Sequence, residues 1–128
     1  MNNKKVACVG SGVIGASWAI CFALKDLDVV VYDINDEVLS KAKTIIHDNL
    51  NILKENNVLD ETRLQEVENH IKLTTSMEEA VRGACFIQES APEHYDVKHQ
   101  VVKEIEKYCL DDAIIASSTS GLLISEIA

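Results

Sequence analysis

The segment from Val6 to Leu24 constrains the fold more than any other part of this chain. It carries no charged residue, and its three glycines, Gly10, Gly12 and Gly15, follow the spacing G-x-G-x-x-G. Such a run, preceded by two lysines, is compatible with two very different structures. One is a leader or a membrane-spanning helix. The other is a short strand that ends in a glycine-rich turn and continues as a buried helix.

The surrounding residues favour the second structure. The letters VACVG form a β-prone run that ends in glycine, and the segment after Lys25 reads DVVVYD, which is typical of another strand rather than of a mature N-terminus. No A-x-A cleavage pattern lies where a signal peptidase requires it. We therefore expect neither a leader nor a membrane-bound segment.

Short apolar runs alternate with longer segments of helical period, which predicts an α/β fold: a Rossmann-type doubly wound parallel sheet. A helix pair is inserted between strands 2 and 3, the first helix being capped by Asn35 and the second beginning at Asp60. Ser76 and Glu79 form a capping box for a further helix. The apolar stripe from Val97 to Cys109 predicts the last one. The expected strands are residues 4–9, 28–33, 71–74, 84–88 and 113–117.

The 128 residues have the length of one ordinary domain, and nothing inside the chain marks a boundary. Folds of this type usually have six strands in the order 3-2-1-4-5-6, so five strands leave the fifth as an apolar edge. The last letters, SGLLISEIA, begin a new helix. We expect residues 1–128 to be one domain of a longer protein.

The net charge argues against polyanionic partners, and the cysteines indicate the redox state of the thiols. Twenty-one acidic residues against twelve basic ones give a formal net charge of −9, which opposes binding to DNA, RNA or an anionic membrane. The four cysteines form no CxxC pair and have no histidine at metal-ligand spacing, so we expect reduced, buried thiols in a cytoplasmic protein without a metal. They are Cys8, Cys21, Cys85 and Cys109.

The glycine pattern lies where a strand ends and a helix begins, which is the context of a dinucleotide-binding turn. Gly10 allows the tight turn, Gly12 lets a pyrophosphate approach the backbone, and Gly15 lets the helix pack closely on the strand. The phosphates are expected on the backbone N–H groups around Val13 and Ile14, at the positive end of the helix dipole.

Asp33 supplies the second half of this pattern at the end of the second strand. A carboxylate in this position accepts hydrogen bonds from the hydroxyls of the adenosine ribose. The same carboxylate repels a 2′-phosphate, and Ile34 and Asn35 provide no arginine to neutralise it, so NAD is expected as cofactor rather than NADP. The alternative is that Asp33 only caps the next helix, although Asn35 already fits that place.

Two more segments, IQESAPE after the fourth strand and ASSTSGL after the fifth, lie at carboxyl ends of parallel strands, where ligands bind in such sheets. Together with the glycine turn they resemble the NAD-binding domain of the 3-hydroxyacyl-CoA dehydrogenase family over essentially the whole chain. The motif QES-x-PE resembles most the branch of this family that contains L-carnitine dehydrogenase and the lambda-crystallin type L-gulonate 3-dehydrogenases.

This resemblance implies roles for residues of both segments. Glu93 and Lys98 match the pair that brackets the nicotinamide ribose, and Ser120 matches the serine that contacts the substrate. Ser118, at a cofactor-binding position, stands where the family commonly has asparagine, and Gly121 where it commonly has a second serine. The alternative is that this serine-rich segment only caps the following helix.

The resemblance also implies what residues 1–128 lack. The general base of the family is a histidine in a later strand, held by a glutamate, and none of the four histidines here lies in that motif. We therefore expect NAD binding with little turnover from these residues alone, and a helical substrate and dimerisation domain beyond them that makes the protein a homodimer. The expected reaction transfers hydride between NAD and C3 of a small-molecule substrate, either an L-3-hydroxyacyl-CoA of fatty acid metabolism or a small 3-hydroxy acid such as carnitine or gulonate.

Two alternatives stay open at this point. Residues 45–70 are rich in acids and poor in bases, which makes them a poor surface for the phosphates of CoA and favours a small acid. The second alternative is that the chain is a stand-alone NAD-binding module, which senses the cofactor without catalysis. Fold alone does not separate these functions.

Overall fold

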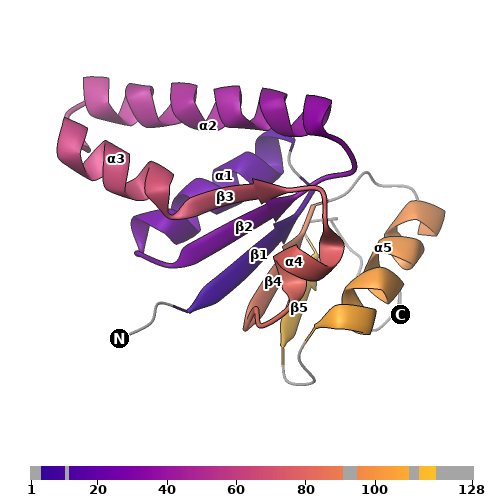
Figure 1. The fold of residues 1–128 in the computed structure, drawn as a ribbon. Helices are drawn as coiled ribbons and strands as arrows, with labels where there is room; N and C mark the ends of the chain where they lie inside the picture. Colours follow the sequence, from indigo (N-terminus) through magenta and orange to yellow (C-terminus); the bar gives the residue numbers. More distant parts are fainter. Residues whose placement is uncertain (1–3, 11, 91–94, 110–112, 118–128) are drawn as a thin grey trace.

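The structure, a computed structural model, describes residues 4–10, 12–90, 95–109 and 113–117. Five parallel strands form one sheet in the order β3-β2-β1-β4-β5 (Figure 1). This confirms the predicted strands and the doubly wound topology. The strands are β1 (Lys5–Val9), β2 (Asp28–Tyr32), β3 (Ile71–Thr74), β4 (Phe86–Glu89) and β5 (Ile114–Ser117).

The fourth strand begins later than predicted. Ala84 N–H donates to the carbonyl of Val81 (3.1 Å) and so belongs to the turn that ends the preceding helix. Pairing with β1 begins at Phe86 and continues to Glu89. The shift makes a glutamate the last residue of a central strand.

Three helices pack on one face of the sheet and two on the other (Figure 1). On β2, Val29 and Val31 contact the first group, whereas Val30 contacts the second. Because both faces are covered, β1 and β2 are nearly continuous apolar runs and do not alternate with polar residues. The helices of the first group are α1 (Val13–Leu24), α2 (Asp36–Glu55) and α3 (Glu61–Asn69), and those of the second are α4 (Met77–Val81) and α5 (Tyr95–Tyr108).

The predicted N-caps of the inserted helix pair are confirmed. The side chain of Asn35 accepts from the N–H of Val38 (2.9 Å) at the start of α2, and that of Asp60 accepts from the N–H of Arg63 (2.7 Å) at the start of α3. Each cap satisfies a backbone donor that the first turn of a helix leaves without a partner.

Only half of the predicted capping box at α4 forms. Ser76 Oγ accepts from Glu79 N–H (3.2 Å), as predicted. The N–H of Ser76, however, donates to Thr74 Oγ1 (3.0 Å), and the carboxylate of Glu79 lies 3.4 Å from the ammonium of Lys72. A hydroxyl and an ammonium from β3 thus replace the reciprocal contact within the helix.

The cysteines do not share one environment. Cys8 on β1 is fully buried, and burial raises the pKa of its thiol to about 12. Cys21 and Cys85 are exposed, so the expectation of four buried thiols is wrong for these two. Cys21 lies on the side of α1 that faces away from the sheet, and Cys85 lies in the turn before β4. All four are free.

Helix α1 begins directly beside the turn that ends β1. A Cβ atom on Gly15 would lie 2.0 Å from the carbonyl oxygen of Gly10, far inside van der Waals contact. Gly10 itself has a φ of 99°, which other residues rarely adopt. Both glycines are therefore necessary for this packing. Among the helices that the structure describes, none has the length and apolar character needed to cross a membrane.

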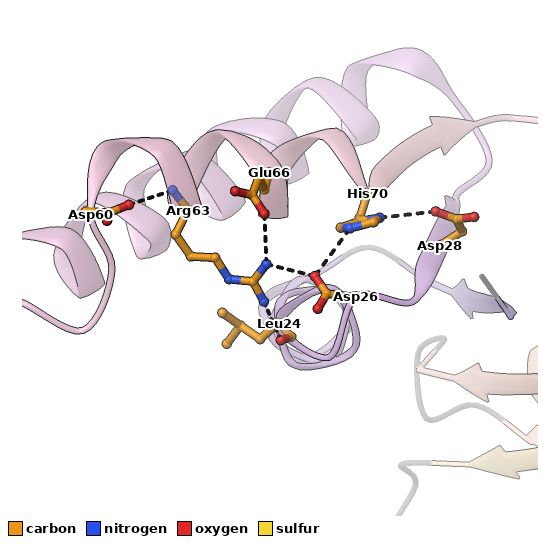
Figure 2. Close-up of polar contacts among 7 residues, drawn as sticks. All are labelled: Leu24, Asp26, Asp28, Asp60, Arg63, Glu66 and His70. Atoms are coloured by element: carbon orange, nitrogen blue, oxygen red, sulfur yellow. Dashed lines mark hydrogen bonds and ion pairs between the residues drawn. The ribbon is translucent and has the colours of Figure 1, made fainter. Parts of the chain in front are cut away.

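A charged cluster joins α3 to the amino-terminal edge of the sheet (Figure 2). Arg63 donates to the carboxylate of Asp26 and to the carbonyl of Leu24, at 2.7 Å each, and so binds the end of α1. His70 lies between two carboxylates, with Nδ1 3.1 Å from Asp28 and Nε2 3.5 Å from Asp26. This amino-edge cluster of Asp26, Asp28, Arg63 and His70 fastens the inserted helices at the end of the sheet opposite the glycine turn.

Neutralising Asp26 is expected to destabilise the fold in a pH-dependent way. The hydrogen bond from Arg63 lowers the pKa of the Asp26 carboxyl. Its contribution is therefore present above the unfolded-state pKa and is lost as the pH falls through the folded-state pKa. We expect Asp26→Asn to unfold at a lower urea concentration than the wild type at pH 7, and this difference to shrink as the pH falls below about 4, the ordinary pKa of an aspartate. Asparagine tolerates the φ of 62° at this position.

A matched control for this prediction is Asp48→Asn. Asp48 is exposed on α2 and makes no ion pair with any residue that the structure describes. The variant Asp48→Asn should unfold at the same urea concentration as the wild type, both at pH 7 and at about pH 3. A difference for Asp26→Asn that is as large at about pH 3 as at pH 7 would contradict the assignment.

Alanine substitutions at two glycines of the turn should differ greatly in their effect on stability. A Cβ on Gly15 collides with backbone, whereas one on Gly12 meets no atom within 4 Å. We expect Gly15→Ala to lower the free energy of unfolding by about 3 kcal/mol or more, and Gly12→Ala to change it by less than about 1 kcal/mol. Urea unfolding followed by circular dichroism measures both. Equal losses for the two variants would show that the close approach is wrong.

Candidate cofactor site

The glycine turn lies at the carboxyl edge of the sheet, between β1 and α1. Gly10 N–H donates to the carbonyl of Tyr32 (2.9 Å), which fixes the turn against the end of β2. Helix α1 starts at Val13 with Gly12 as N-cap, and no side chain caps it. Its first turn also holds no acidic residue. The free N–H groups and the positive end of this helix are therefore available to an anionic ligand.

The space beside Gly12 fits the expected pyrophosphate. No protein atom among the described residues lies within 4 Å of the place that a Cβ on Gly12 would occupy. Ile14, in the first turn of α1, is 57% exposed, so the approach to the helix start is open. These observations favour the phosphate position expected from the sequence, with the N–H groups of Val13 and Ile14 as donors.

Asp33 follows β2 directly and lies next to the glycine turn, because β1 and β2 are neighbours and Val9 is paired with Tyr32. Its N–H donates to Thr74 O (3.3 Å), and its Oδ1 accepts from Ile34 N–H (2.7 Å). These bonds hold the carboxylate at the carboxyl edge. Since Asn35 caps α2, the alternative in which Asp33 is the helix cap is not what the structure contains.

The neighbouring phenol remains neutral in this environment. Partial burial raises the pKa of Tyr32, and the negative charges of Glu104 and Asp33 raise it further by smaller amounts. Protonated at neutral pH, Tyr32 adds no negative charge beside the turn.

The end of β4 contains a residue to which the sequence pattern gave no role. The side chain of Glu89 is fully buried, and in the sheet it lies between Val9 of β1 and Ser117 of β5. Gln88 before it is also buried. A buried charged residue is unusual outside functional sites and ion pairs. The signal in the sequence was the letters QE at the end of an otherwise apolar strand.

The remaining expected site residues follow the ends of β4 and β5. Glu93, Ser118 and Ser120 lie outside the described residues. Lys98 belongs to α5, but the position of its side chain lies outside the description, as does that of Val13. The structure therefore places the glycine turn and Asp33 together, and the arrangement of the other residues stays a prediction. In the part of the chain that is described, no cluster of histidine, cysteine or carboxylate side chains could hold a metal ion.

Comparison with known proteins agrees with this geometry. Residues 5–128 match the family model described as the NAD-binding domain of 3-hydroxyacyl-CoA dehydrogenase. An L-carnitine dehydrogenase/betainyl-CoA thioesterase of Rhizobium sp. is 38% identical over 123 residues, which are 96% of this chain and 24% of that protein. The human lambda-crystallin homolog is 34% identical over 95% of this chain and 39% of its own length.

Solved structures give the same result. The chain superposes on (S)-3-hydroxybutyryl-CoA dehydrogenase from Ralstonia eutropha with a TM-score of 0.91 at 29% identity, covering 98% of this chain and 44% of that one. The chain thus spans well under half the length of each of these relatives. The glycine turn and Asp33 fit the cofactor that the family model names. We conclude that this chain belongs to the 3-hydroxyacyl-CoA dehydrogenase family as its NAD-binding domain.

Proposed function

We propose that this chain is the cofactor-binding part of a dehydrogenase that transfers hydride between NAD and C3 of a small 3-hydroxy acid. The observation that carries the proposal is the uncapped start of α1 beside Gly12, next to a carboxylate at the end of β2. An L-3-hydroxyacyl-CoA substrate is the main alternative, because the family and a solved relative carry CoA in their names.

The charges of residues 45–70 favour a small acid over a CoA ester. Within residues 45–70 the cations are Lys54 and Arg63. Lys54 pairs with Glu61, and Arg63 with Asp26. Neither is free to bind phosphate, and the acids nearby would repel it. L-carnitine, which carries a cationic group, suits such an acidic surface, and a relative with 38% identity has carnitine in its name.

Each site residue has one task in the proposed reaction. Val13 and Ile14 N–H groups bind the pyrophosphate beside Gly12, and Asp33 accepts hydrogen bonds from the adenosine ribose. Glu93 and Lys98 hold the nicotinamide ribose, with Ser118 as a further cofactor contact. NAD, when bound, supplies the hydride acceptor. The three glycines of the turn also belong to the cofactor-binding residues, through their backbone: Gly10, Gly12 and Gly15.

Ser120 is proposed to orient the substrate. A serine hydroxyl both donates and accepts, so it can hold the C3 oxygen while hydride leaves that carbon. The proton of the substrate hydroxyl goes to a general base, for which we propose a histidine outside residues 1–128. That histidine would lie in a later strand, and a helical domain beyond it would form the homodimer. The free thiols favour a cytoplasmic protein.

Removing the carboxylate of Asp33 should weaken NAD binding selectively. Two charge-assisted hydrogen bonds to the ribose are lost, while repulsion of a 2′-phosphate also disappears. We expect Asp33→Ala to raise the Kd for NAD about tenfold or more and to reduce the preference for NAD over NADP. Calorimetric titration with both cofactors measures this. The control is Glu37→Gln, an exposed carboxylate in the first turn of α2, which should bind like the wild type. Equal affinity of the wild type for NAD and NADP would overturn the assignment.

Loss of the Ser120 hydroxyl should slow turnover without weakening cofactor binding. We expect Ser120→Ala in the full-length protein to lower kcat about tenfold with 3-hydroxy acid substrates, because one hydrogen bond at the reacting oxygen is lost. Its Kd for NAD should stay unchanged, whereas Ser118→Ala should raise that Kd. An unchanged rate for Ser120→Ala would mean that this serine only caps a helix.

A further inference from the structure

A groove at the open edge of the sheet is lined by residues of α2, α3 and β3. Figure 1 shows α2 and α3 on the side of the sheet where β3 lies. Its volume is about 410 Å³, which is within the range of small-molecule sites, roughly 300 to 1,000 Å³. The groove shares no lining residue with the glycine turn or with Asp33. The lining residues are Lys43, Ile46, His47, Glu68, Ile71, Lys72 and Leu73.

The floor of the groove is apolar. Ile46 on α2 is almost fully buried, and Ile71 and Leu73 on β3 pack against the core beneath it. Ile71 and Leu73 are half-buried and keep apolar surface at the groove, whereas Ile46 is only 5% exposed. A ligand with an apolar body would remove part of this surface from water.

One cation of the rim has no carboxylate partner. His47 Nδ1 lies 2.8 Å from Glu68 Oε1, and Lys72 Nζ lies 3.4 Å from Glu79 Oε1. Lys43, exposed on α2, forms no ion pair with any residue in the described ranges. Glu68 is hydrogen-bonded to His47 on the rim, and Lys43 is the rim cation that makes no ion pair within the described ranges.

The edge of β3 adds backbone groups to the same place. Val29 N–H donates to His70 O, and Asp33 N–H to Thr74 O, so these carbonyls face β2. Because alternate residues of a parallel strand bond to opposite sides, the N–H and C=O groups of Ile71 and Leu73 face the open edge. These two residues offer their N–H groups beside a groove whose volume of about 410 Å³ lies in the range of small-molecule sites. A small ligand therefore fits this place.

We propose that this groove binds a small amphipathic anion, with an apolar body on Ile46, Ile71 and Leu73 and a carboxylate on Lys43. The N–H of Ile71 or Leu73 gives the carboxylate a second donor. The overall charge of −9 does not prevent this contact, because charges beyond about 8 Å are largely screened at physiological ionic strength. The proposal is independent of the dehydrogenase reaction.

The test is calorimetric titration of the full-length protein with octanoate in the presence of saturating NAD. Lys43→Gln is expected to weaken octanoate binding about fivefold or more, because one charge-assisted hydrogen bond is lost. Lys41→Gln, a lysine on α2 that does not line the groove, is the matched control and should bind like the wild type. Hexanoate should bind more weakly than octanoate, by up to about fourfold for each CH₂ removed.

Three results would overturn the proposal: no binding of octanoate, equal binding to Lys43→Gln and the wild type, or binding of n-octanol as tightly as octanoate. Displacement of octanoate by NAD or by a 3-hydroxy acid would also overturn it, because the ligand would then occupy the cofactor or substrate cleft. None of these results bears on NAD binding itself, which the titrations of Asp33→Ala measure separately.

Discussion

The close approach of Gly15 to the carbonyl of Gly10 is the contact on which the rest of the structure depends. A Cβ would lie 2.0 Å from that oxygen, so the position accepts only hydrogen. The contact brings the start of α1 against the end of β1, and α1 then packs through Ala16 and Ala19 on the sheet. Because these residues are small, the helix axis lies near the strands. One missing methyl group thus determines both the packing of the first βαβ unit and the position of the helix end that faces an anion.

The two edges of the sheet have different chemistry as a result. At the carboxyl edge the start of α1 carries no capping side chain, so backbone donors remain for a ligand. At the amino edge Arg63 binds the end of α1 and the carboxylate of Asp26 (Figure 2). Polar groups there satisfy one another within the protein, which holds α3 in place. The same helix therefore ends in a closed charge cluster and begins without a side-chain cap among the described residues.

Local signals in the sequence predicted most of this fold. Asn35 and Asp60 act on backbone donors three residues away, so their caps depend on no distant residue. The capping box at Ser76 formed only in part, since β3 brings Thr74 and Lys72 to the same groups. The burial of Glu89 was also beyond local patterns, because it follows from pairing with two strands that are distant in the chain. The residues after β4 and β5 owe their expected roles to a resemblance and not to local chemistry.

The groove beside β3 illustrates the same limit and extends the argument. Lys43 on α2 and Ile71 on β3 are distant in sequence. They line the same groove because the inserted helices α2 and α3 pack beside the edge strand β3. An insertion between β2 and β3 adds a surface without moving the cofactor turn, because the turn contacts α1, the ends of β1 and β2, and Ser90 after β4, none of which belongs to the insertion. The charge and shape of the insertion can therefore change while the glycine turn of the parallel sheet stays the same. This separation lets the charges of the inserted helices vary without altering the glycine turn.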